Sequence, residues 1–379
     1  MTYRKFLSPI LILIISGTGC KESFEPPAIK TGATILVVDG FLNNGPDTTL
    51  LYLSVSKKLI DTVTSVQENG AQLFVEDPDG NTLYSFQPLN DSGTYYVPGM
   101  NLDSKLKYRV RIIRANGKQY ISDLITVMNT PPIDSISFTH SDKGIDIEAN
   151  THDQSNEAKY FRWQYTETWQ YHAAFFSELI YIDGSLGERT PDQYIYQCWR
   201  TQPSTQLLLA TTSNLSEDLV YHFVLRHIDQ DALELSMKYY IKLKQYAVTK
   251  EAYIYMQNLR KLTEQTGSIF DPQPSEVVGN IHAANDPTET VLGYMTATNA
   301  TAKEVYITND QAQPWNYKTD CVIVVIPVDD ISSIFSDSHV VPLAKKGSDF
   351  NLAGIFATTY PCGDCRAFGG VTRKPPFWP

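Results

Sequence analysis

Apolar and polar positions alternate along much of the chain after residue 33, which is the pattern of β-strands with one buried face. The clearest case is Lys107–Ile113, in which apolar residues alternate with basic ones. Asn69-Gly70 and Asp79-Gly80 have the composition of hairpin turns between such strands. About seven strands at this spacing predict an immunoglobulin-like β-sandwich over residues 33–130, ended by the extended pair Pro131-Pro132.

Residues 131–379 continue the strand pattern and are predicted to form a second β-rich domain, either whole or divided into two sub-domains. One segment, 250–266, has helical spacing instead. Thr249 offers an N-cap oxygen, and Gly267 supplies a C-terminal stop. The predicted fold class is therefore mainly β, with an N-terminal immunoglobulin-like sandwich, a second β-rich domain and one inserted α-helix. The apolar stripe of that helix is made by Ala252, Met256, Leu259 and Leu262.

Aromatic residues are dense between Tyr160 and Trp199 and permit two interpretations. Trp163, Trp169 and Trp199 are candidate ligand contacts, because aromatic faces stack on sugars and other flat surfaces. The spacing by two of Phe161, Trp163 and Tyr165 instead predicts the core face of a strand. Core packing is the favoured interpretation.

The first nineteen residues have the plan of a secretory signal, with Arg4 and Lys5 before a short apolar run and small residues after it. Small residues directly before Cys20 resemble a lipobox, so Cys20 is the predicted lipidation site and the first mature residue. Residues 20–32 then form a polar tether. The alternative is an ordinary cleaved signal followed by a free cysteine. Acyl chains would anchor the protein to a membrane.

The charge balance bears on possible partners. The 379 residues include 31 Lys and Arg against 42 Asp and Glu, a formal net charge of −11. Nucleic acid is not an expected partner, because phosphate binding needs a clustered basic surface. No apolar stretch after residue 20 is long enough for a membrane-spanning helix.

Four cysteines remain after Cys20: Cys198, Cys321, Cys362 and Cys365. An even number in an exported chain predicts disulfides, and three pairings are open. Cys362-Gly-Asp-Cys365 also has the spacing of a redox pair or of half a zinc site, but a second half-site is missing. We therefore predict structural disulfides, with no metal and no cofactor.

Recognisable catalytic motifs are absent from the sequence: it has no metalloprotease helix motif, nucleophile elbow or phosphate-binding glycine loop. His222, His227 and Asp229 come nearest to a constellation, and structural histidines are the favoured interpretation. The protein is accordingly not expected to be an enzyme. A hydrolase acting on glycans stays open as an alternative, because glycosidase carboxylates leave no short signature.

Several short sequence segments, taken in their order along the chain, resemble a family of Bacteroidota outer-membrane lipoproteins known as domain of unknown function 4249. They are Leu36–Gly40, Gly70-Ala71, Cys198-Trp199, Gly267–Ser275, Gly279–Ile281, Val291–Tyr294 and the ending from Cys362 to Trp378. Lys21 and Glu22, directly after Cys20, are similar to the export signal for the outer face of the outer membrane.

The resemblance implies a companion of a TonB-dependent outer-membrane receptor, lipid-anchored and facing the cell surface. It also implies structural roles for Cys198, Cys362 and Cys365. The expected function is that of a binding or accessory subunit of the transporter in nutrient uptake, with an unknown ligand. The alternatives are the glycan-active hydrolase and an adhesin or envelope scaffold without catalysis.

Overall fold

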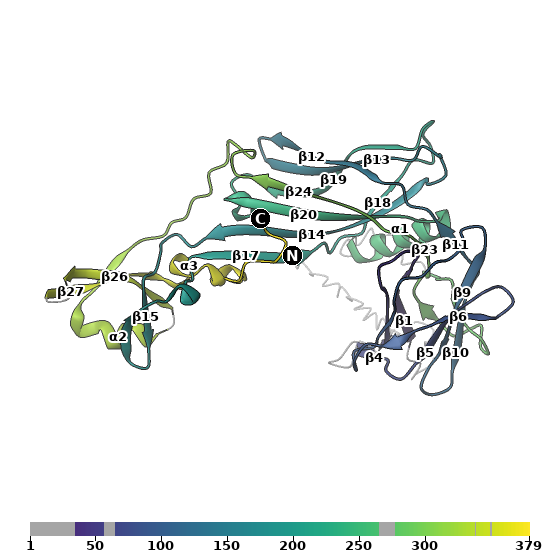
Figure 1. The fold of residues 1–379 in the computed structure, drawn as a ribbon, viewed down its shortest axis with the longest axis horizontal. Helices are drawn as coiled ribbons and strands as arrows, with labels where there is room; N and C mark the ends of the chain where they lie inside the picture. The colour runs from purple at the N-terminus through teal and green to yellow at the C-terminus, as the bar shows by residue number, and fades with distance from the viewer. Residues whose placement is uncertain (1–34, 57–64, 265–276, 338, 349–350) are drawn as a thin grey trace, which may run out of the picture. The chain divides into compact units, whose positions relative to one another are not determined.

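The computed structural model describes residues 35–56, 65–264, 277–337, 339–348 and 351–379. Cys20, the signal and tether predicted over 1–32, and Gly267 lie outside the described residues. The described part is built mainly from β-strands, so the predicted mainly-β fold class is confirmed (Figure 1).

Two sheets form a first sandwich around one apolar core. Tyr108, Val110 and Ile112 are buried in that core, as their alternation predicts. Arg109 and Arg111 lie on the opposite face, where both pair with Glu76. The strands of the first sheet, in spatial order, are β22 (Val291–Leu292), β1 (Ile35–Gly40), β3 (Thr49–Ser56), β8 (Thr94–Val97) and β7 (Gln87–Pro88), with β4 (Ser65–Gln67) beside β3. Those of the second sheet are β2 (Leu42–Asn43), β23 (Ala297–Thr298), β11 (Ile125–Met128), β9 (Lys107–Ile113), β10 (Gln119–Ser122) and β21 (Ile281–Ala283), with β5 (Gln72–Glu76) beside β9 and β6 (Thr82–Ser85) beside β5.

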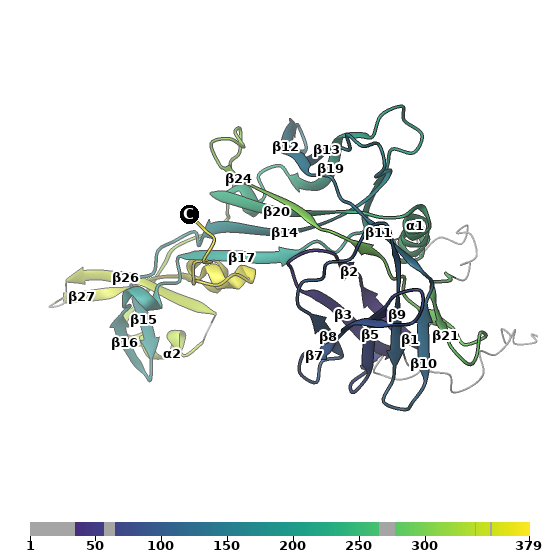
Figure 2. The same cartoon turned by 45° about the vertical axis from the view of Figure 1, so that its right-hand side comes forward.

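The first sandwich is completed by a segment from much later in the chain. β21 pairs with β10 (Figure 2). β22 runs parallel to β1, and β23 lies between β2 and β11. Ile281, Met295 and Ala297 are buried in its core. The prediction that residues 131–379 all belong to the second domain is therefore wrong for residues 281–298. These strands are only two or three residues long, and partners distant in sequence decide where they pair.

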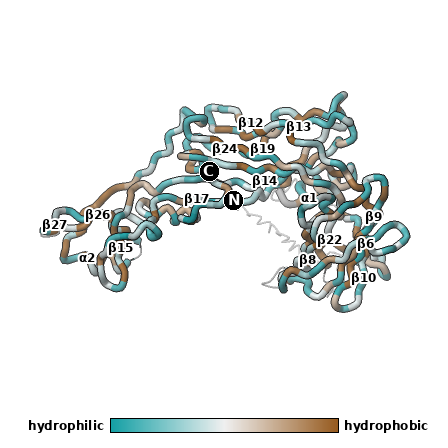
Figure 3. Tube along the Cα trace, in the orientation of Figure 1, coloured by the Kyte–Doolittle hydropathy of each residue, from teal (hydrophilic) through white to brown (hydrophobic). Residues whose placement is uncertain are grey.

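A second sandwich follows β11. Its apolar core lies between two antiparallel sheets and includes Phe161, Trp163 and Ile241. Both apolar and polar stretches occur along its strands, as the brown and teal of the hydropathy colouring show (Figure 3). The smaller sheet is β12 (Ile133–Ser141), β13 (Gly144–His152) and β19 (Leu219–Asp229). The larger is β17 (Gln197–Pro203), β14 (Tyr160–His172), β20 (Lys238–Ala247) and β24 (Thr301–Thr308), with β18 (Leu208–Thr211) beside β14.

Helix α1 (Lys250–Glu264) connects β20 to the returning segment and lies where the helical pattern predicts it. The Thr249 hydroxyl accepts a hydrogen bond from the Ala252 amide at 3.3 Å, which is the expected N-cap. Ala252, Tyr253 and Met256 are buried against Tyr246 and other aromatic residues. The helix therefore packs through Ala252 and Met256 of the predicted stripe, together with Tyr253.

A third group of strands makes up the C-terminal region. A sheet of β25 (Val324–Ile326), β27 (Asn351–Thr359) and β26 (Val340–Ser348) packs with the hairpin β15 (Leu179–Ile182) and β16 (Ser185–Glu188). The short helices are η1 (Pro191–Gln193), η2 (Leu233–Leu235), η3 (Val328–Asp330), α2 (Ile331–Phe335), α3 (Tyr360–Gly363) and η4 (Cys365–Phe368). Among the described residues, none of the helices has the length and apolar character to cross a membrane.

Candidate functional site

The three tryptophans offered as ligand contacts are buried. Trp163, Trp169 and Trp199 expose 0%, 3% and 7% of their surface. Trp163 stacks on Phe223 at 4.6 Å between ring centroids and donates its indole N–H to Gln245 Oε1 at 2.9 Å. These side chains do not offer a stacking surface to a ligand, and the core-packing interpretation is the one that the burial supports.

Trp199 is covered by the end of the chain itself. The backbones of Trp199 and Val371 exchange two hydrogen bonds, of 2.9 and 2.8 Å. Trp378 packs into the same cluster with Tyr240, and its indole N–H donates to Gln170 Oε1 at 3.1 Å. The C-terminal tail thus occupies the outer face of the larger sheet, where Trp199 had been a candidate for ligand contact.

A cavity of about 550 Å³ lies where the ends of β14 and β17 meet the loop after β24. Five ring side chains contribute to its wall. They are His172, Phe175, Tyr196, Trp315 and Tyr317, and Ser236, Asn309, Asn316 and Thr319 add polar groups. We take this cavity as the candidate functional site, because an aromatic concave surface with a few polar groups is typical of small-molecule binding.

Neighbouring strand ends hold one side of the cavity. His172 ends β14 and stacks on Tyr196, with 4.3 Å between the ring centroids and 20° between the planes. The Ala173 amide donates to the Tyr196 carbonyl at 2.7 Å, which joins the two segments directly. This wall is therefore an extension of the β14–β17 pairing.

The loop after β24 forms the other side and is held by a set of amide hydrogen bonds. Asn309 Nδ2 donates to the Leu235 carbonyl at 2.8 Å, and Gln313 Nε2 donates to Asn309 Oδ1 at 2.7 Å. The Trp315 indole N–H donates to the Ala232 carbonyl at 3.0 Å. Because its hydrogen bonds are made, Trp315 is fixed in place, with its ring at the wall of the cavity.

The lining residues carry no full charge near neutral pH. They include no Asp, Glu, Lys or Arg, and burial lowers the pKa of His172, which favours its neutral form. The buried Ser236 hydroxyl has no hydrogen-bond partner within the described part of the chain. Such a site suits an uncharged polar molecule with a flat face, which can stack on the rings and bond to hydroxyl and amide groups.

Acid–base chemistry of the glycosidase kind finds no support in this cavity. That chemistry needs two carboxyl groups facing each other across the substrate, and no carboxylate lines this cavity. In the described ranges, no group of three or more His, Cys, Asp and Glu residues is placed to hold a metal ion.

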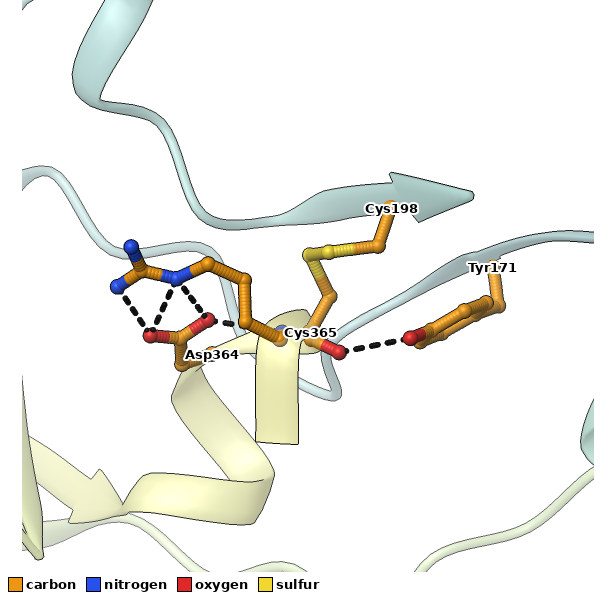
Figure 4. Close-up of a disulfide and its surroundings, with 5 residues drawn as sticks. Tyr171, Cys198, Asp364 and Cys365 are labelled. Atoms are coloured by element: carbon orange, nitrogen blue, oxygen red, sulfur yellow. Dashed lines mark hydrogen bonds and ion pairs between the residues drawn. A yellow bond between two sulfur atoms is a disulfide. The ribbon is translucent and has the colours of Figure 1, made fainter. Parts of the chain in front are cut away.

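All four described cysteines form disulfides, as predicted. Cys198 is bonded to Cys365, and Cys321 to Cys362. Cys362 and Cys365 thus belong to different disulfides, so the redox-pair interpretation of this short motif is wrong. Figure 4 shows the first disulfide with Tyr171, whose hydroxyl donates to the Cys365 carbonyl at 2.9 Å. The bond joins η4 to β17 and fixes the start of the tail that covers Trp199.

The histidine constellation lies on the outward face of the smaller sheet of the second sandwich. His222 Nδ1 pairs with Glu148, which also accepts a hydrogen bond from the Thr139 hydroxyl at 3.0 Å. His227 Nδ1 lies 2.6 Å from Asp146 Oδ1, and its Nε2 lies 3.5 Å from Asp229 Oδ1. Each histidine is satisfied by a carboxylate on the sheet, as the structural interpretation predicts.

Sequence reasoning missed the residues of the cavity. The run Gln313-Pro314-Trp315-Asn316-Tyr317 combines aromatic and amide side chains, and this mixture is the one signal that could have pointed to a binding loop. His172, Tyr196 and Ser236 are distant from it in sequence. Only the fold brings them to the same cavity.

Comparison with known proteins places the chain in a family. The family model described as "Domain of unknown function (DUF4249)" matches residues 21–304. The chain belongs to this family, which confirms the resemblance stated from its motifs. No curated protein matches the chain.

Three solved structures show distant likenesses to the chain. A two-domain fibronectin type III segment of chicken tenascin is 13% identical, covering 56% of this chain and 90% of that one, with a TM-score of 0.17. Two structures of Escherichia coli alpha-2-macroglobulin are 11% and 12% identical, with TM-scores of 0.20 and 0.19. They cover 58% and 86% of this chain but only 15% and 26% of those chains. At these TM-scores the likenesses carry no argument about function.

Proposed function

We propose that the protein is a surface-exposed outer-membrane lipoprotein, anchored through Cys20, that acts as a binding or accessory subunit of a TonB-dependent transporter in nutrient uptake. Family membership, shown by the match over residues 21–304, is consistent with this proposal, as is the signal-like start of the chain. The single observation that carries the binding role is the uncharged aromatic cavity of about 550 Å³.

The ligand class follows from the chemistry of the cavity. Its rings and neutral polar groups match a sugar-like molecule, whose flat apolar face stacks while its hydroxyls bond to serine and amide side chains. A charged ligand would lose hydration without gaining an opposite charge from the lining. The proposed role is capture of an uncharged polar nutrient.

Affinity purification from detergent-solubilised outer membranes tests the partner. The tagged protein is expected to recover one dominant TonB-dependent receptor by mass spectrometry. A Cys20→Ala variant is the matched control, since it removes the anchor and leaves every described residue unchanged. Recovery of the membrane-bound lipoprotein without a β-barrel transporter would refute the accessory role.

The capture role is tested separately, on an array of neutral oligosaccharides. Asn316 is exposed and Tyr317 is half-buried in the wall of the cavity. The variants Asn316→Ala and Tyr317→Ala each remove one of these side chains. We expect each to weaken binding of any retained glycan by about tenfold, as for loss of a stacking or hydrogen-bond contact. Tyr221→Ala serves as control, because Tyr221 is 70% exposed on another sheet. Retention of no glycan by the folded protein would contradict this ligand class.

A further inference from the structure

A second cavity, of about 360 Å³, lies between β1–β3 of the first sandwich and the outer face of β14 and β20. The β14–β20 register places Arg162 opposite Tyr246 and Gln164 opposite Lys244. Phe161 and Trp163, which alternate with these residues, point into the core of the second sandwich. Arg162 and its neighbours therefore face the cavity because of strand alternation.

Arg162 is the unusual member of this cavity. Its Nε atom is buried and has no hydrogen-bond partner among the described residues, and Asp39, which also lines the cavity, attracts the guanidinium electrostatically without a hydrogen bond to Nε. Its Cζ lies 5.9 Å from the centre of the Tyr246 ring, a contact that attracts a cation but accepts no hydrogen bond. Burial lowers the pKa of Arg162, which reflects its loss of hydration. A partly buried cation whose buried Nε has no hydrogen-bond acceptor is costly for a fold to retain.

The other charges of the cavity restrict the charge of any ligand that could bind to Arg162. Asp39 and Asp47 line it together with Arg162 and Lys244, so two carboxylates and two cations share the space. A dianion such as phosphate would meet both carboxylates at close range, whereas a single negative charge can sit on the side of the cations. Phe41 packs on Tyr246, with 4.9 Å between the ring centroids, and supplies an apolar wall beside the charges.

We propose that this cavity is a binding site for a small organic monocarboxylate, whose carboxyl group is held by the Arg162 guanidinium and whose apolar body lies against Phe41 and Tyr246. The planar guanidinium fork matches a carboxylate in a bidentate arrangement. This site is distinct from the uncharged aromatic cavity and does not depend on the transporter role.

Binding of 3-phenylpropionate tests the proposal, with its uncharged isostere 3-phenylpropionamide as the matched probe. Titration calorimetry on the full mature chain should give a dissociation constant at least about tenfold lower for the carboxylate than for the amide. Arg162→Met should weaken carboxylate binding at least about tenfold and leave amide binding unchanged. Inorganic phosphate should compete poorly.

Control variants separate binding from folding. Arg189→Met removes an arginine whose Nε already donates to Ser177 Oγ at 3.0 Å, and it should bind as the native protein does. Should Arg162→Met fail to fold, Arg162→Lys keeps the charge without the fork, and Lys244→Met alters an exposed residue of the same cavity. Both should weaken binding by a smaller factor. The proposal would be overturned by equal affinity for acid and amide, or by stronger binding of phosphate. It would also be overturned by unchanged binding in all three cavity variants, or by no binding of 3-phenylpropionate up to about 10 mM.

Discussion

The first sandwich buries one large apolar cluster that draws on both of its sheets, and no disulfide joins its described residues. The C-terminal sheet has only two small clusters, one around Phe335 and Ile355 and one around Val341 and Leu343. Both disulfides end in the short segment that follows that sheet. The contrast indicates that cross-links stabilise this protein where apolar burial is scarce.

The two regions also differ in how they use distant parts of the chain. The first sandwich recruits residues 281–298 by strand pairing and core burial. The C-terminal region is tied to the second sandwich by the disulfide between Cys198 and Cys365, across 167 residues of sequence. Each long-range connection closes a large loop, and each therefore carries a substantial share of the stability of its region.

The largest effect is expected from removal of the long-range disulfide. The double variant Cys198→Ala/Cys365→Ala should lower the free energy of unfolding by about 3–5 kcal/mol, because the unfolded chain regains the entropy of a large loop. Hydrogen exchange should show the loss in peptides from residues 360–379 and leave the β9 peptides protected. Uniform loss of protection across both regions would contradict the proposed difference between the first sandwich and the C-terminal region.

The next effect concerns the returning segment. Gly293 has a φ of +139°, and a Cβ placed there would lie 2.3 Å from the Val38 carbonyl oxygen in β1. Gly293→Ala should therefore destabilise the first sandwich by about 2–4 kcal/mol, measured by urea unfolding. Gly187→Ala is the matched control, since nothing lies within 4 Å of its Cβ and its φ is not in the left-handed region. If the two variants unfold alike, the segment does not hold that sandwich together.

A smaller loss is expected from the tail that covers Trp199. Trp378 is 5% exposed, packs with Trp199 and Tyr240, and forms one indole hydrogen bond. Trp378→Ala should cost about 2–3 kcal/mol, at or below the usual range for a core tryptophan, because its neighbours near the chain end can relax. Thermal unfolding measures the loss, and Phe377→Ala, at an exposed residue, should cost much less. Equal losses would show that the tail does not depend on this anchor.

The smallest effect is a pH dependence of stability that comes from His172 in the candidate cavity. Burial lowers the pKa of His172 below its ordinary value of 6.5, so the unfolded chain takes up this proton first. Stability should therefore fall as the pH drops below about 6.5, until the folded pKa is passed. His172→Phe keeps a ring against Tyr196 and should remove this contribution. The test is the difference between the two proteins in urea midpoint at pH 7.5 and 5.5. A difference that does not change with pH would contradict it.

Helix α1 and the strands β22 and β23 illustrate what could be predicted and what could not. Helix α1 could be predicted because its N-cap Thr249, its apolar stripe and its length all lie within one short stretch, residues 249–264. β22 and β23 have two residues each, and nothing local distinguishes them from turns. The candidate cavity was missed for the same reason, since His172 and Trp315 meet only after the sheets have formed.

By itself, the sequence determined the mainly-β class, the alternation that buries Phe161 and Trp163, the helix, the family, and the presence of disulfides in this chain. These properties depend on neighbouring residues or on composition, so they can be predicted without knowing which residues are in contact. The tertiary structure alone decided which cysteines pair, that residues 281–298 return to the first sandwich, and that Trp199 is covered by the C-terminal tail. Each of these outcomes depends on burial and pairing between segments far apart along the chain, and those interactions form only once the chain is folded.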